Sequence, residues 1–327
     1  PFIGRITGKE VAQKLRDQQY DILLTNDFAI TAFTPTQKPV VLYTDVMIPL
    51  SRDERNLPHS RCSNLNTLGF ILSAYTIRKG LKRADLCIFP AEWSAREASR
   101  YCSSCFKKIH VIPFGANIDD PGPEIVQRRI LKRALKQEHI TLLFVGKDWF
   151  RKGGPIAIET VVELRRRGIN AHLHLVGSVP PTPVNEPFIH IHGLLDKTNP
   201  EQAKRLYHLY QESDFLILPS SSEGYVICAL EAAAFGLPVI AYDTIGVRDA
   251  VKNGETGVLL PLGTKGSIFA EEIVNLLADH ERYNRLVIGA RTHYEHSANW
   301  KTTVKTLMSI ISEEVGNQNA RAVCSHV

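Results

Sequence analysis

Two glutamates eight residues apart stand at the start of an apolar, helix-like segment. Glu223 and Glu231 belong to the run Ser220-Ser-Ser-Glu-Gly-Tyr-Val-Ile-Cys-Ala-Leu-Glu231, which follows the strand-like residues Phe215-Leu-Ile-Leu218. Phosphates bind well at a helix N-terminus, because its free N–H groups and its dipole face the anion. Glu231 would lie about 12 Å along the helix axis from Glu223. The spacing therefore predicts a sugar-nucleotide site, in which Glu223 binds sugar hydroxyls and Glu231 reaches a ribose.

A second group of charged residues follows another strand-like run. The stretch Phe144-Val-Gly-Lys-Asp-Trp-Phe-Arg-Lys-Gly-Gly154 combines a strand end, a glycine turn, spaced cations and a glycine pair that opens a helix. Backbone N–H groups and lysine charge brought together in this way suit a diphosphate. A solvated basic turn is the alternative interpretation.

These motifs, in this order, resemble retaining glycosyltransferases of the GT-B fold, family four (group 1 glycosyltransferases). The Glu-x7-Glu run, Phe235-Gly-Leu-Pro-Val-Ile240 and residues 246–257 carry the resemblance, and the 144–154 version looks like a bacterial subset. The resemblance implies an α/β fold of two Rossmann-like domains facing a cleft. It also implies that a sugar passes from a nucleoside-diphosphate sugar to an acceptor hydroxyl, with retention at the anomeric carbon. Neither a cofactor nor a metal is expected, and no Asp-x-Asp occurs in the sequence.

The resemblance also assigns roles to individual residues. Glu223 would position the donor sugar, while Lys147 and Lys152 would stabilise the leaving diphosphate. Lys147 stands where the family usually has arginine, so it would act as a point charge. Val226 stands where the family often has glycine, which adds a side chain where an N–H group should approach phosphate. The remaining donor-binding candidates are Gly146, Arg151, Gly224, Tyr225, Val226 and Glu231.

Strands that alternate with helices predict parallel, doubly wound sheets in both halves of the chain. We expect an N-terminal Rossmann-like acceptor domain at 1–125, a donor domain at 126–290, and a helical segment at 291–327 that crosses back to the first domain. The family plan has more strands before residue 21, so the first domain is expected to be incomplete. Its predicted strands are 21–25, 40–43, 86–89 and 109–112, and its acceptor or cleft candidates are Asp45, Gly115 and Asn117.

Several local interpretations stay open from the sequence. Asp45 could bind the acceptor hydroxyl or cap the next segment. Ser94 and Glu97 have the spacing of a capping box. The basic run 128–136 is interpreted as a solvated helix face, with acidic-lipid binding as the alternative. Cys102 and Cys105 are expected to be unligated thiols.

Composition limits the classes of partner. The 327 residues carry a net charge of +5, which permits anionic substrates or peripheral contact with an acidic membrane surface. That charge is too small for a typical nucleic-acid binder, and no Gly-x-Gly-x-x-Gly follows a predicted strand. We expect a cytoplasmic protein, or one peripheral at the inner membrane face. The alternatives to a transferase are a non-catalytic GT-B scaffold and a sugar-nucleotide epimerase.

Overall fold

The chain divides into two compact units. In this computed structural model, residues 2–45, 47–48, 67–134 and 139–324 are described. Unit 1 takes the described residues up to Phe114 and those from Lys301 onward, and unit 2 takes Gly115–Trp300. The predicted divisions, after residues 125 and 290, differ from the divisions after residues 114 and 300.

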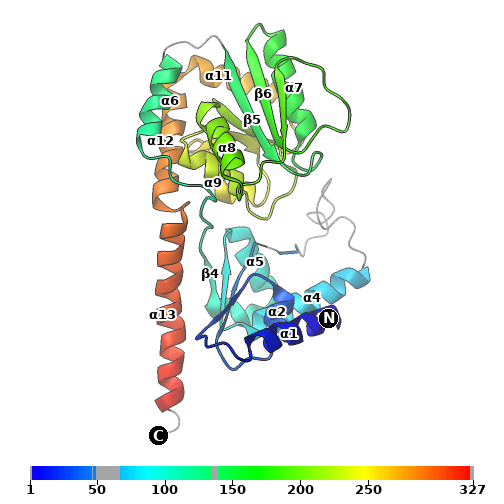
Figure 1. Cartoon of the computed structure of the whole chain (residues 1–327), viewed down its shortest axis with the longest axis vertical. Helices are drawn as coiled ribbons and strands as arrows, with labels where there is room; N and C mark the ends of the chain where they lie inside the picture. Colours follow the sequence, from blue (N-terminus) through cyan, green and yellow to red (C-terminus); the bar gives the residue numbers. More distant parts are fainter. Residues whose placement is uncertain (1, 46, 49–66, 135–138, 325–327) are drawn as a thin grey trace. The chain divides into compact units, whose positions relative to one another are not determined.

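Unit 1 is built on a four-stranded parallel sheet (Figure 1). Its strand order, β1-β2-β3-β4, follows the chain. β2 and β3 are buried at every position, which is typical of parallel strands that are covered on both faces. All four strands were predicted to within two residues: β1 Leu23–Thr25, β2 Val40–Tyr43, β3 Leu86–Phe89 and β4 Ile109–Val111.

The long C-terminal helix belongs to unit 1. Leu307, Ile311 and Val315 of α13 are buried against Val41 and Ile88 of the sheet. The helices of unit 1 are α1 Phe2–Leu15, α2 Phe28–Phe33, α4 Thr67–Arg83, α5 Glu92–Tyr101, the 3-10 helix η1 Ser103–Lys108, and α13 Trp300–Cys324.

Unit 2 contains a six-stranded parallel sheet of order β10-β9-β8-β5-β6-β7. Numbered from β5, this is the 3-2-1-4-5-6 order of a doubly wound sheet, and the strand order reverses between β5 and β8, which are parallel neighbours. β5, β8 and β9 carry apolar side chains at nearly every position, and nearly all of these residues are buried, so both faces of the strands are covered. The strands are β5 Ile140–Gly146, β6 Ala171–Gly177, β7 Ile189–Gly193, β8 Phe215–Leu218, β9 Val239–Tyr242 and β10 Gly257–Leu260.

Helices complete the core of unit 2. Helix α7 packs against α11, and α12 packs against α6 and α9. The apolar stripes of α7, α11 and α12 join the strands in one buried cluster, which includes Phe144, Phe215, Phe269 and Tyr283. The helices are α6 Glu124–Ala134, α7 Gly154–Arg166, α8 Pro200–Glu212, α9 Ile227–Ala234, α10 Val247–Ala250, α11 Gly266–Ala278 and α12 His280–His296.

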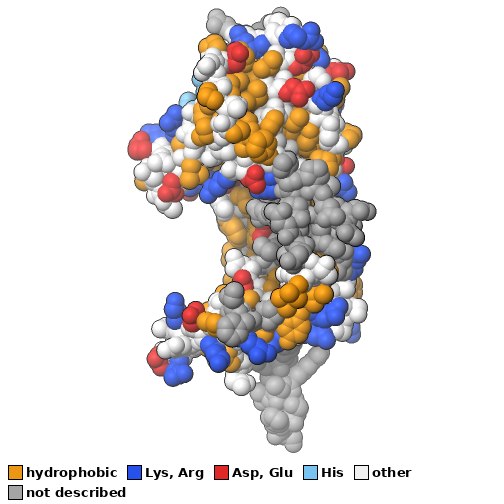
Figure 2. Space-filling view, turned by 90° about the vertical axis from the view of Figure 1, so that its right-hand side faces the viewer, with side chains coloured by type: hydrophobic (Ala, Val, Ile, Leu, Met, Phe, Trp, Pro, Cys, Tyr) orange, Lys and Arg blue, Asp and Glu red, His pale blue; other side chains and the backbone are white. Residues whose placement is uncertain are grey.

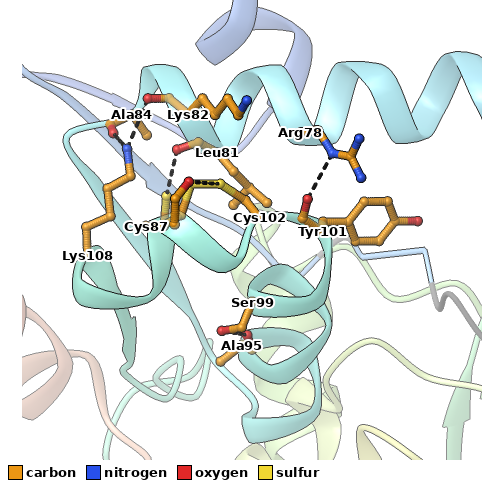
Figure 3. Close-up of a disulfide and its surroundings, with 12 residues drawn as sticks. Arg78, Leu81, Lys82, Ala84, Cys87, Ala95, Ser99, Tyr101, Cys102 and Lys108 are labelled. Carbon is orange, nitrogen blue, oxygen red and sulfur yellow. Dashed lines mark hydrogen bonds between the residues drawn. A yellow bond between two sulfur atoms is a disulfide. The ribbon is translucent and has the colours of Figure 1, made fainter.

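Two local expectations in unit 1 were wrong. The predicted capping box fails because α5 begins at Glu92, with Ala91 at the N-cap. Ser94 instead donates to the Ala91 carbonyl, and Glu97 pairs with Arg100 inside the helix. Cys102 and Cys105 are not free thiols but form a disulfide at the end of α5 (Figure 3).

The surface mixes charge types. Figure 2 shows basic and acidic side chains interspersed with apolar ones on one face. The first half of α4 leaves Leu68, Ile71 and Tyr75 at least 49% exposed. Among the described residues, no helix has the length and apolar character needed to cross a bilayer.

Four histidines form a ladder across β6 and β7. His172 Nδ1 lies 3.0 Å from His190 Nε2, and His174 Nδ1 lies 2.8 Å from His192 Nε2. The rings stack, so these histidines lie on one face of the sheet. Arg205 can only donate, and its NH2 lies 2.8 Å from His192 Nδ1. Therefore His192 carries its proton on Nε2 and donates to His174, which fixes both tautomers.

This ladder predicts acid sensitivity. Burial, followed by the neighbouring histidines, lowers the pKa of His174 from 6.5 to about 3. The unfolded chain therefore binds this proton at higher pH than the folded chain. The free energy of unfolding should fall as the pH drops from about 6.5 towards about 3. Denaturant unfolding across this pH range should show a weaker fall in His174→Gln, whereas the exposed His296→Gln should match the wild type. Equal slopes in all three proteins would contradict this interpretation.

Candidate functional site

The two charged motifs meet where the strand order of the unit 2 sheet reverses. The 144–154 motif begins at the end of β5, which ends at Gly146, and the motif with Glu223 and Glu231 follows β8, which ends at Leu218. β5 and β8 are paired neighbours, so both motifs leave the same carboxyl edge of the sheet. Ligands of doubly wound sheets bind outside this edge, at the point of reversal. The fold therefore brings together two segments about 70 residues apart in the chain.

Two glycines allow the loops after β5 and β8 to approach each other closely. A Cβ on Gly146 would lie 2.7 Å from Lys152 Cγ, so only glycine lets the lysine side chain cross the strand end. Gly153 has a φ of +79° at the N-cap of α7, and a Cβ there would lie 2.1 Å from the Pro219 carbonyl oxygen. A side chain at either position would force Lys152 or the segment at Pro219 to shift.

Glu223 is the centre of this contact. Its carboxylate Oε1 lies 2.6 Å from Lys152 Nζ and 3.1 Å from Arg151 NH1. The Glu223 side chain is only 4% exposed, whereas that of Lys152 is 15% exposed. A buried carboxylate needs such partners, because an unpaired buried charge costs several kcal/mol. Glu223 and Lys152 thus form a buried ion pair that joins the two motifs.

Arg151 holds the two loops together. Its guanidinium donates to Asp148 Oδ2 at 3.1 Å, to the Ser222 carbonyl at 2.8 Å and to Glu223. The main chain adds a second link, since Ser221 N–H donates to the Arg151 carbonyl at 2.9 Å. The side chain of Arg151 is 5% exposed. Its geometry is therefore that of a clamp between loops rather than of a solvent-facing cation.

Glu231 lies on α9 and is almost completely enclosed. Lys197 Nζ is bonded to Oε1, and the Tyr210 hydroxyl donates to Oε2 at 2.8 Å. The Asn117 N–H donates to the same carboxylate. Burial raises the pKa of Glu231, while Lys197, Tyr210 and Asn117 act in the opposite direction. Three donors thus hold one carboxylate in place.

Buried Arg129 of α6 fixes the two helices that make this contact. Its Nε donates to the Phe235 carbonyl at 3.0 Å, after the last turn of α9, and its NH2 donates to the Tyr210 carbonyl of α8 at 2.9 Å. A guanidinium at helix C-termini satisfies carbonyls that lack intrahelical partners. The basic run 128–136 is therefore not a solvated face throughout, because Arg129 is 4% exposed.

The other predicted site residues occupy varied positions. Tyr225 and Val226 are buried, Gly224 is half-buried, and α9 begins after Val226 at its N-cap. Lys147 is exposed, and its charge adds to the Thr198 hydrogen bonds that lower the pKa of Asp196.

The acceptor and cleft candidates fall in different units. Asp45 lies in unit 1 and is half-buried. Gly115 and Asn117 lie in unit 2. A Cβ on Gly115 would meet the Trp300 backbone at 2.2 Å, and the Asn117 side chain accepts from Trp300 Nε1 at 2.8 Å. Asn117 reaches Glu231 through its main chain, so it is the cleft candidate that the structure brings to a donor candidate.

Comparison with known protein families identifies the domain that carries this site. Residues 139–279, which include both charged motifs, match the family model for group 1 glycosyl transferases. This segment is a group 1 glycosyltransferase domain. Its strands β5 to β10 are the sheet described above.

Curated relatives carry the same kind of name. The D-inositol 3-phosphate glycosyltransferase of Gordonia bronchialis is 29% identical over 252 residues, which is 73% of this chain and 54% of the relative. That of Geodermatophilus obscurus is 29% identical over 260 residues, which is 73% of this chain and 56% of the relative. The chain thus spans a little over half the length of these relatives.

Solved structures extend the likeness to both units. A sucrose-phosphate synthase from Thermosynechococcus elongatus has a TM-score of 0.71 and 19% identity, covering 95% of this chain and 78% of the synthase. Anabaena HepE, in complex with UDP and glucose, has a TM-score of 0.67 and 17% identity, covering 93% of this chain and 80% of HepE. The fold is GT-B, as the sequence motifs implied.

Sequence reasoning missed Lys197 and Tyr210, which both bind the Glu231 carboxylate. Lys197 lies in the loop after β7, 34 residues before Glu231, and no spacing rule connects the two. Tyr210 left a weak signal, since a tyrosine on the apolar stripe of a helix needs a partner for its hydroxyl. Among the described residues, no group of three or more His, Cys, Asp or Glu side chains is arranged to hold a metal ion.

The close approach at Gly153 can be measured separately from its backbone strain. Gly153 and Gly168 have φ values of +79° and +82°, but nothing lies within 4 Å of a Cβ on Gly168. Gly168→Ala should cost about 1–2 kcal/mol of left-handed strain. Gly153→Ala should cost about 1–3 kcal/mol more, because its methyl group overlaps the Pro219 carbonyl. Denaturant unfolding measures both variants, and equal losses would show that the loops do not need this contact.

Proposed function

We propose that the chain is a retaining glycosyltransferase, which moves a sugar from a nucleoside-diphosphate sugar to an acceptor hydroxyl without a metal ion. One observation carries the proposal: Lys152 and Glu223, from loops after neighbouring strands, pair at 2.6 Å at the point of reversal in a group 1 domain. Such a pair offers a cation to phosphate and an anion to the sugar. HepE, whose fold is similar, is described in complex with UDP-glucose, which supports a donor of that class.

The chemistry follows from the charges. The bond between the anomeric carbon and the phosphate oxygen breaks, and its electron pair stays on the diphosphate. Lys152 stabilises that developing charge, helped by Lys147 and by N–H groups at the start of α9. Glu223 positions the sugar and offsets positive charge on its ring. The acceptor oxygen then bonds to the same face of the anomeric carbon, and its proton passes to the departing diphosphate.

The remaining donor contacts complete the proposal. Glu231 receives the ribose hydroxyls, and Gly146 and Gly224 let the chain approach the diphosphate. Asp45 binds the acceptor hydroxyl. The relatives' name makes D-inositol 3-phosphate the first acceptor to test. Peripheral contact with an acidic membrane is supported by the exposed apolar side chains of α4, and co-sedimentation with anionic vesicles tests it.

Turnover of UDP-glucose tests the assignment. Glu223→Ala and Lys152→Ala should each lower kcat/KM for UDP release by about 10²–10³-fold, because each removes charge stabilisation of the transition state. Lys204→Ala, which removes an exposed charge on α8, should match the wild type. Binding of UDP without turnover in the wild type would favour a non-catalytic scaffold. Sugar interconversion without transfer would favour an epimerase.

Metal independence is tested with the same assay. Because Lys152 and the start of α9 supply the charge stabilisation, turnover should persist at its full rate after EDTA treatment and desalting. Loss of turnover that added Mg²⁺ or Mn²⁺ restores would contradict this part of the proposal.

A further inference from the structure

We infer that Lys197 is a positioning residue for the donor: its ammonium group keeps the Glu231 carboxylate ionised and aimed, so that it can accept hydrogen bonds from a ribose diol. The inference rests on the proposed function, because it takes Glu231 as the ribose-binding group. It concerns a residue outside both charged motifs, in the loop between β7 and α8.

The contacts around Glu231 single out Lys197. An ionised carboxylate offers about four acceptor positions, and the three described donors leave room for a ligand hydroxyl. Tyr210 is fully buried, and Asn117 contributes its main chain. The side chain of Lys197 is 33% exposed, while that of Glu231 is 2% exposed. Lys197 is therefore the side chain through which the enclosed carboxylate is linked to solvent.

The charge on Lys197 opposes the effect of burial. The other ionisable groups described around Glu231 are neutral near pH 7, because burial raises the pKa of Tyr210 well above its usual value and that of Cys228 to about 12. A carboxylate with no cation in such a place takes up a proton. A protonated Glu231 would lose the charge-assisted hydrogen bonds that a diol makes to a carboxylate, which are about twice as strong as neutral ones.

The preference for a ribose diol isolates this effect. The Kd is measured by calorimetry for whichever of UDP, GDP and ADP binds best, and for its 2′,3′-dideoxy analogue. The diol preference is the Kd of the dideoxy analogue divided by the Kd of the nucleoside diphosphate. This ratio cancels any attraction between Lys197 and the diphosphate. In Lys197→Met this ratio should fall about tenfold near pH 7. It should recover as the pH is raised above 7, because Glu231 then ionises in the variant.

Three controls separate positioning from a structural role. Lys197→Arg keeps the cation and should retain most of the diol preference, even if Lys197→Met proves unstable. Lys204→Met removes an exposed charge from α8 and should change nothing. In Glu231→Gln, which cannot ionise, adding Lys197→Met should not alter the ratio further.

The outcomes are distinct. A diol preference in Lys197→Met equal to that of the wild type, or lowered equally at every pH, would overturn the inference and leave the proposed function standing. A wild type that binds none of the three nucleoside diphosphates would overturn the proposed function, and the inference with it.

Discussion

The ion pair between Glu223 and Lys152 is the interaction on which the rest of the site depends. It joins the loops after β5 and β8, and it exists because these parallel neighbours both end at the same edge of the sheet, at the point where the strand order reverses. A buried carboxylate with two cations is stable only while both loops keep their places. The glycines at 146 and 153 and the Arg151 clamp therefore serve one purpose, which is to hold two loops within ion-pair distance.

A second carboxylate is held in a different way. Glu223 has cations from the β5 loop, whereas Glu231 has one lysine, one tyrosine hydroxyl and one main-chain N–H from three separate segments. Arg129 binds the C-terminal ends of both α8 and α9, so it fixes the distance between Tyr210 and Glu231. Both acids are thus anchored, and the described anchors all belong to unit 2.

Unit 1 follows a plainer plan. Its parallel sheet is covered partly by α13, whose buried residues lie more than 200 positions after the β3 residues that they cover. Apolar packing, rather than a short connection along the chain, therefore holds the C-terminal helix to the sheet of this unit. Its acceptor candidate, Asp45, follows β2 at the carboxyl edge of the sheet, which is where a doubly wound sheet presents its ligands.

The sequence by itself determined the strands, most helices and the two charged motifs. Buried parallel strands are short apolar runs, and Phe215–Leu218 is recognisable without any partner. It misplaced the start of α5, because a Ser-x-x-Glu pattern also occurs inside helices. Only the tertiary structure decided that Arg151 is a clamp, that Arg129 is buried and that Lys197 meets Glu231. Each of these charges is paired across dozens of residues, and local spacing carries no information about such distances.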